Sequence, residues 1–355
     1  MPPTDPPQGE NSPKPSGKPK ARAGRKGPPS DVVGIEIGAG LAEGAPAVRL
    51  HRSPEGFLRI VAAGFVPVVS DIESILAMPA DMRGPWSLPP AFRAPAAALA
   101  VTAPDALVRQ SDSVEDATAD FDASTLRTKA FDAGRKGSLP FVAFMPEELA
   151  RRVARLLPEG RKPTAVSIQV SPLARVNAFA ASPALGAAGG TAVLVQIASN
   201  TTTIALFAKG AVALYRELSV GEEDSLHAVA GPMNVDNATA RELLEGGLVD
   251  PAPFLGPLLM PVFRQAELST DWVLRRNGLV VEKFFVAGPA ALAPHWAAIF
   301  RDQTGREATT CDPIADFPQE DGADLPVDFD KVSGRFAAAL GAAAAAMQDE
   351  EEDAT

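Results

Sequence analysis

Short apolar runs, bounded by glycine or proline, recur along the first half of the chain and predict β-strands. Three of them follow one another closely at 32–37, 47–50 and 58–61, and the first ends in Gly38-Ala39-Gly40. We interpret these three runs as a β-meander. Further strands are expected at 97–102, 106–110, 141–144 and 165–170.

The same order of signals begins again after a segment rich in glycine and alanine at 184–190. Apolar runs at 192–197, 201–208 and 212–218 predict a second meander, with a Lys209-Gly210 turn between its last two strands. Another strand is expected at 283–287. Because both halves run strand, glycine turn, strand, strand and then helices, we predict a duplicated α/β unit that forms two lobes.

Helical patterns lie between these strands. Prolines crowd residues 65–95, so a helix there is confined to 72–78. Residues 111–137 are rich in Asp, Ser and Thr, which predicts a surface helix or a mobile loop. Other helices are expected at 146–157, 171–179, 237–244, 261–277 and 329–347.

Composition narrows the class of protein. The 355 residues are 46% hydrophobic and 22% charged, which is an ordinary globular balance and enough chain for two lobes. Neither an uninterrupted run of about 18 apolar residues nor a signal peptide is recognised, so we expect a cytoplasmic protein that does not itself cross the membrane. The net charge of -11 argues against nucleic acid as a partner, because phosphate neutralisation needs clustered Lys and Arg.

Cysteine and histidine do not point to a metal centre or to covalent catalysis. Cys311 is the only cysteine, which excludes an internal disulfide, and three scattered histidines lack the spacing of metal ligands. No histidine lies near an acid and a Ser or Cys in a known catalytic signature. We therefore expect no catalytic residue of the esterase or protease type and no metal held by side chains.

The ends of the chain differ from its body. Residues 1–31 combine Lys and Arg with Pro, Gly and Ser, which predicts a disordered basic tail; it either solubilises the protein or attracts an anionic membrane face or an acidic partner. Residues 348–355 form an acidic tail. Between them we expect a first lobe at 32–190, with a small inserted subdomain at about 71–138, and a second lobe at 191–347.

Five segments resemble, in order, the motifs of actin-like ATPases, and the best match is to the PilM family of type IV pilus assembly. Val33-Gly34-Ile35-Glu36-Ile37-Gly38 resembles the first phosphate loop of that family. The segment 194–203 resembles the second phosphate loop, and 215–221, which ends in Gly221, resembles the strand that follows it. The segments 284–290 and 336–341 are similar to the adenine-side turn and the closing helix. The resemblance implies an actin-like, ribonuclease H-like α/β fold with two lobes around a central cleft.

The resemblance also implies a nucleotide site, in which glycine turns hold phosphate and one aspartate from each lobe holds magnesium through water. Glu36 and Gln196 replace the two aspartates here, Ala198 replaces a glycine, and Pro289 and Ala290 replace two more. Leu244 stands where relatives place a lysine. The implied cofactor is ATP with magnesium, or none. The residues that would bind it are Gly34, Glu36, Gly38, Gln196, Ser199, Asn200, Thr201, Thr202, Gly221 and Gly288.

A purely structural reading of the same residues stays open. Ser199 to Thr203 could form an ordinary strand and turn, since Ser and Thr favour such positions. Glu36 could be a charged residue held by a structural partner, and Gly38 and Gly40 could be ordinary turn glycines.

For function, the resemblance implies a cytoplasmic scaffold of a type IV pilus or type II secretion-like complex, with ATPase activity weak or lost. Its expected partner is the cytoplasmic N-terminal segment of a PilN-like inner-membrane protein, bound in a groove of the inserted subdomain, and self-association is a further implication. Such a scaffold would lie at the inner membrane through its partner. The alternatives are an active ATPase or kinase of the superfamily, or an FtsA-like cell-division protein, although the acidic C-terminus differs from the membrane helix of the latter.

Overall fold

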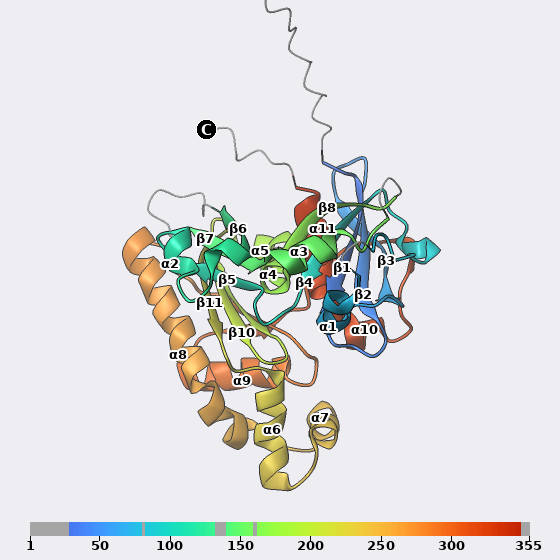
Figure 1. Cartoon of the computed structure of the whole chain (residues 1–355). Helices are drawn as coiled ribbons and strands as arrows, with labels where there is room; N and C mark the ends of the chain where they lie inside the picture. Colours follow the sequence, from blue (N-terminus) through green and yellow to red (C-terminus); the bar gives the residue numbers. More distant parts are fainter. Residues whose placement is uncertain (1–27, 80–81, 132–139, 159–161, 349–355) are drawn as a thin grey trace, which may run out of the picture.

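The computed structural model describes residues 28–79, 82–131, 140–158 and 162–348. The predictions for residues 1–27, 132–137 and 349–355, which include most of the basic tail and the acidic tail, lie outside the described residues. The described chain forms two large mixed sheets, a small third sheet and the helices that cover them (Figure 1).

The first large sheet contains six strands in the order β14-β3-β2-β1-β4-β8. Strands β1, β2 and β3 form the predicted antiparallel meander, and β4 and β8 continue the sheet parallel to β1. The strands are β1 (Asp31–Ile37), β2 (Ala45–Arg52), β3 (Leu58–Val66), β4 (Ala96–Val101), β8 (Thr164–Val170) and β14 (Gln319–Asp324).

The second large sheet repeats this plan with the order β11-β10-β9-β12-β13. Its first three strands form an antiparallel meander, and β12 and β13 follow parallel to β9. The strands are β9 (Ala192–Ile197), β10 (Thr202–Ala208), β11 (Ala211–Leu218), β12 (Phe284–Ala287) and β13 (Ala308–Thr310). The shared strand order confirms the prediction of a duplicated α/β unit.

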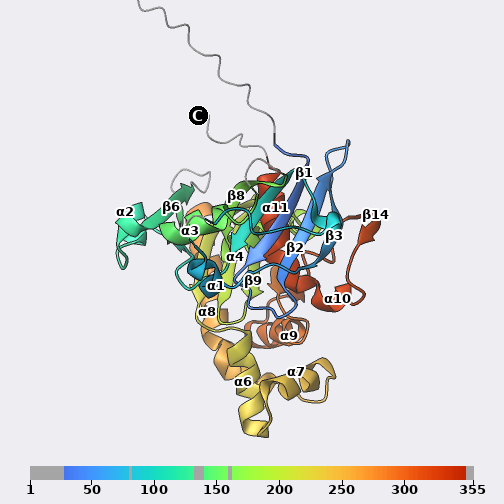
Figure 2. The same cartoon turned by 45° about the vertical axis from the view of Figure 1, so that its right-hand side comes forward.

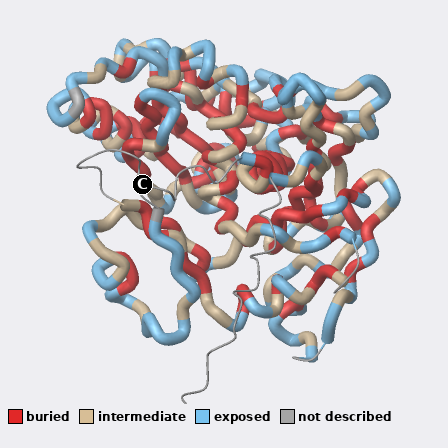
Figure 3. Tube along the Cα trace, turned by 90° about the horizontal axis from the view of Figure 1, so that it is seen from above, coloured by how far each residue is buried: buried red, intermediate tan, exposed pale blue. Residues whose placement is uncertain are grey.

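Two buried helices join the sheets, namely α4 (Ser171–Ala181) and α11 (Ala337–Ala346). They pack on each other; α11 lies on the first sheet, and α4 also contacts β9 of the second (Figure 2). The side chains of α11 are almost all alanine, and Gly341 lies so close to α4 that an added Cβ would be 1.7 Å from the Ala174 carbonyl oxygen. Small residues therefore set the close approach of these helices. In Figure 3 the buried residues, coloured red, run through the middle of the molecule.

The small third sheet has the order β5-β7-β6, and β7 lies beyond the range 71–138 that was predicted for an inserted subdomain. Its β5 edge lies against β11 of the second sheet. Phe144 fills its core, and the Arg109 guanidinium lies 5.5 Å from the ring of Phe121. The elements between β3 and β8 are α1 (Ile72–Ala77), η1 (Pro90–Phe92), β5 (Leu107–Gln110), α2 (Val114–Ala117), η2 (Ala123–Thr125), β6 (Leu126–Phe131), β7 (Phe141–Pro146) and α3 (Glu147–Ala154), besides β4 of the large sheet. Of these, η1 contacts β2 and β3 of the first large sheet.

Helices cover the outer face of the second sheet, where Trp296, Phe263 and Phe300 fill the core. These are α6 (Glu222–Met233), α7 (Asn237–Glu245), α8 (Ala252–Asn277) and α9 (Ala293–Thr304); the shorter elements are α5 (Pro183–Ala187), α10 (Phe329–Val332) and η3 (Ser333–Phe336). Within the described ranges, no helix combines the length and apolar character needed to cross a bilayer.

Several elements differ from the sequence-based expectation. Helix α8 begins at Ala252, earlier than the expected 261, and contains Pro257 and Pro261 near its start. Strand β6 lies within 111–137, where a helix or loop was expected, and the predicted helix 329–347 is divided into α10, η3 and α11. The range 191–347 predicted for the second lobe also includes β14 and α11, which pack on the first sheet.

Candidate functional site

The loop after β1 forms one side of the candidate site. Gly38 has a φ of +81°, its N–H donates to the Ser70 carbonyl oxygen at 2.7 Å, and a Cβ there would be 2.0 Å from the Thr102 carbonyl oxygen. Only glycine fits this turn and this close approach. Gly34 lies under α11, where an added Cβ would be 1.8 Å from the Ala339 carbonyl oxygen. Gly34 therefore serves the packing of a helix.

Glu36 lies at the end of β1 with its side chain 2% exposed. Its Oε1 accepts hydrogen bonds from Arg175 Nη2 at 2.6 Å and from Thr102 Oγ1 at 2.8 Å. Arg175 belongs to α4 and Thr102 follows β4, so three separate elements meet at this carboxylate. A buried carboxylate needs such partners, because its desolvation is costly unless it is paired and hydrogen-bonded.

The second loop, between β9 and β10, contains most of the other predicted residues. The Ala198 N–H donates to the Thr201 carbonyl oxygen at 2.9 Å, which closes a hairpin with Ser199 and Asn200 exposed at its tip. Thr202 is buried, and its hydroxyl donates to the Val220 carbonyl oxygen at 2.6 Å. Gln196 is also buried; its Nε2 donates to the Ile197 carbonyl oxygen at 3.2 Å, and its Oε1 has no partner among the described residues.

The N-terminus of α6 faces this second loop. The N–H groups of Glu222 and Glu223 donate to the carbonyl oxygens of Ala198 and Ser199, both at 2.9 Å. Gly221 permits this contact, because a Cβ there would be 2.4 Å from the Ser199 carbonyl oxygen. A helix N-terminus usually attracts anions, but here three acidic residues occupy its first turn and the loop takes up its donors. This end of α6 is therefore poorly suited to a phosphate group.

Gly288 ends β12 beside the second loop. Its φ is +156°, and an added Cβ would be 2.7 Å from the Cβ of Ile197. Its carbonyl oxygen would lie 3.3 Å from a Cβ placed on Gly334 of η3. Leu244, discussed above as a replacement for lysine, is instead buried in the core of the second lobe.

A polar group on the second sheet faces α4. Thr203 is the strand partner of both Gln196 and Glu217, so the three residues align across β9, β10 and β11. Tyr215 is buried nearby and its hydroxyl donates to Glu217 Oε2 at 3.0 Å. Burial, and next the negative charge of Glu217, hold the pKa of Tyr215 well above its ordinary value, and the charge of Arg175 acts in the opposite direction. The direct side-chain contact of Arg175 is with Glu36 of the first sheet.

Magnesium does not fit this set of residues. The guanidinium of Arg175 has hydrogen-bond donors and no oxygen atom, so it cannot be a ligand of magnesium. It already compensates the negative charge of Glu36. Gln196, on β9 of the second sheet, is neutral and supplies no negative charge for a metal ion. Within the described ranges, no group of three or more His, Cys, Asp or Glu side chains is arranged to hold a metal ion. Sequence reasoning missed Arg175, although a single charged residue in the largely apolar segment 172–181 is a usable signal.

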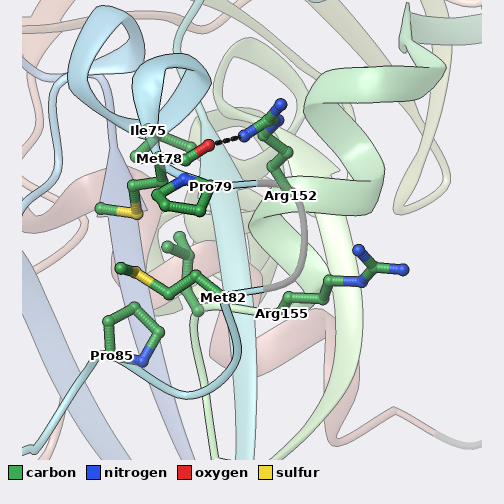
Figure 4. A pocket seen from close by; sticks show the side chains of 8 residues that line it. Ile75, Met78, Pro79, Met82, Pro85, Arg152 and Arg155 are labelled. Atoms are coloured by element: carbon green, nitrogen blue, oxygen red, sulfur yellow. Dashed lines mark hydrogen bonds between the residues drawn. The ribbon is translucent and has the colours of Figure 1, made fainter.

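A second feature is a shallow groove between α1 and α3, on the side of the small sheet. Ile75, Met78 and Pro79 line it from α1 and the turn after it, Met82 and Pro85 from the following segment, and Arg152, Arg155 and Leu156 from α3 and its end. Figure 4 shows the two methionine side chains on one side and the two arginines on the other, with Arg152 bonded to the Met78 carbonyl oxygen. Met82 is 41% exposed. The groove therefore combines an accessible apolar wall with a basic one.

Comparisons with known proteins bear on the fold. No family model matches the chain, and no curated protein does. Among solved structures, a PilM-PilN type IV pilus biogenesis complex matches with a TM-score of 0.62 and 16% identity, over 89% of this chain and 98% of that chain. The ethanolamine utilization protein EutJ from Carboxydothermus hydrogenoformans matches with a TM-score of 0.43 and 16% identity, over 89% and 90%.

A further match is a non-polymerising MamK variant bound to AMPPNP, with a TM-score of 0.43 and 12% identity, over 90% of this chain and 100% of that chain. At these levels of identity the likeness concerns the fold. Together with the two sheets of repeated strand order, it confirms that the chain has the actin-like fold, as expected from its motifs.

Proposed function

We propose that the protein is a cytoplasmic scaffold of a type IV pilus or type II secretion-like complex at the inner membrane, with little or no ATPase activity. The observation that carries this proposal is the likeness to the PilM-PilN complex, which extends over nearly all of that chain. The proposed partner is the cytoplasmic N-terminal segment of a PilN-like membrane protein.

The groove between α1 and α3 is the proposed docking site for this segment. Methionine side chains are flexible and polarizable, and so they adapt to the shape of an apolar peptide. Arg152 and Arg155 line the opposite wall, where Arg152 is ion-paired with Glu148 at 2.6 Å and donates to the Met78 carbonyl oxygen. The exposed methionine wall therefore suits a short apolar segment.

The test combines capture with a matched pair of variants. Tagged protein is incubated with detergent-solubilised inner membranes, and the bound proteins are identified by mass spectrometry. A peptide that matches the cytoplasmic N-terminus of the captured protein is then titrated against wild type, M82E and M260E. Met260 lies on α8 and is 50% exposed, similar to Met82, but it lies outside the groove.

We expect M82E to bind the peptide about tenfold more weakly, a loss of roughly 1.4 kcal/mol, because a carboxylate replaces an apolar contact. M260E should bind as wild type does. The proposed role is wrong if no membrane protein of the pilus or secretion type is captured. Equal binding by M82E and M260E would instead place the partner elsewhere on the surface.

A further inference from the structure

One oxygen of the buried Glu36 carboxylate is held by two groups of the protein itself. Arg175 Nη2 and Thr102 Oγ1 share its Oε1 at 2.6 and 2.8 Å, and the Arg175 side chain is itself only 18% exposed. These contacts supply the positive charge and the hydrogen bonds that a desolvated carboxylate requires. A second cation at the same carboxylate would lie close to the guanidinium, and like charges repel strongly where water is excluded.

In the second sheet, the position that corresponds to Glu36 in the motif holds an amide and not an acid. Gln196 is neutral, and its Nε2 is bonded to the Ile197 carbonyl oxygen. The carboxylate aligned with it across the sheet, Glu217, accepts the hydroxyl hydrogen of Tyr215. The charge of Arg175 acts against the upward shift of the pKa of Tyr215, which burial and Glu217 cause.

We propose that Arg175 is a resident cation that takes the charge-compensating place of a nucleotide-bound magnesium ion, so that the cleft between the two sheets excludes magnesium nucleotides. The guanidinium stays with the protein through its covalent link to α4. This inference concerns the cleft alone and involves no partner, so its test is separate from that of the proposed function.

The single tyrosine of the chain provides a direct probe of the cleft. Incorporation of 3-fluorotyrosine places one ¹⁹F resonance at Tyr215, which is buried beside the polar group. Full-length wild-type protein is titrated with millimolar ATP, with magnesium chloride, and with both, and each titration is repeated with EDTA. The thermal midpoint is recorded in parallel. We expect neither the resonance nor the midpoint of wild type to respond to magnesium.

Two variants connect this behaviour to Arg175. R175M leaves the Glu36 carboxylate buried without its cation, so its thermal midpoint should fall well below that of wild type. E36Q/R175M removes both charges and should recover most of that loss. If R175M fails to fold, the wild-type titration and the double variant still decide the question. A wild-type resonance shift that requires both ATP and magnesium and is abolished by EDTA would overturn the proposal, as would an R175M protein as stable as wild type.

Discussion

At the residue scale, two glycines determine how closely helix α11 approaches its neighbours. Gly34 allows α11 to approach β1, and Gly341 allows it to approach α4, with room for no Cβ at either position. The backbone of neither glycine has a positive φ, so the requirement arises from space and not from conformation. Both contacts lie in the layer between the two sheets.

Substitution of Gly34 by alanine should therefore be costly. The added methyl group would overlap the Ala339 carbonyl oxygen, and overpacking of this kind costs about 3 kcal/mol of unfolding free energy. G186A is the matched control, because Gly186 is exposed on helix α5 with no atom within 4 Å of the added Cβ. Urea denaturation should show a large loss for G34A and none for G186A. Equal stability of the two variants would contradict the close contact.

The sequence shows that Gly34 is part of a motif but does not show what lies over it. Its neighbour Ala339 is at the far end of the chain, and no local pattern connects the two positions. The same is true of Glu36, because its partner Arg175 comes from another element. That the ten predicted residues bind nucleotide remains a prediction. The residues that contact them could not be predicted from the sequence, because they come from distant parts of the chain.

At the scale of elements, the meander strands were predictable because their apolar runs are bounded by clear turn residues. Strand β6 was not, because most of its side chains are exposed and its composition is polar. Only residues 261–277 of helix α8 were predicted, because Pro257 and Pro261 near its start are residues that usually interrupt a helix. Strand β14 has no apolar pattern at all, and it is defined by its pairing with β3.

Gln110 connects the small sheet to the second large sheet. Its Nε2 donates to the Ala213 carbonyl oxygen at 3.2 Å, and its Oε1 accepts from the Tyr215 N–H at 3.3 Å. Q110A should lower the unfolding free energy by about 1–2 kcal/mol, since each lost hydrogen bond contributes roughly 1 kcal/mol. It should also speed hydrogen exchange of the amides in β11. Q319A, at an exposed position of β14, is the control; unchanged exchange in Q110A would argue against this bridge.

At the scale of the whole molecule, one hydrophobic cluster extends over both large sheets. Phe179 of α4 contacts Phe207 and Phe285 of the second sheet, with ring centroids 5.3 and 5.2 Å apart. The same cluster contains Ile35 and Leu99 of the first sheet. An interface of this kind couples the stability of one lobe to that of the other.

We expect the lobes to unfold together. Intrinsic fluorescence from Trp86, Trp272 and Trp296 should follow the same urea transition as circular dichroism. F179A should shift both curves equally, with a loss of about 3–5 kcal/mol, whereas F57A, at a position 65% exposed, should shift neither. Two separate transitions in wild type would show that the lobes are independent.

The course of the chain has a consequence for biosynthesis. The second sheet is built from residues 192–310, yet β14 and α11 come later and return to the first sheet. Strands β1 to β4 leave the ribosome before the second sheet but are covered by α11, which follows that sheet in the chain, so the second lobe can assemble in between. During translation the first lobe must keep an open apolar face for most of the time, and a chaperone that shields β1 and β4 would act at that stage.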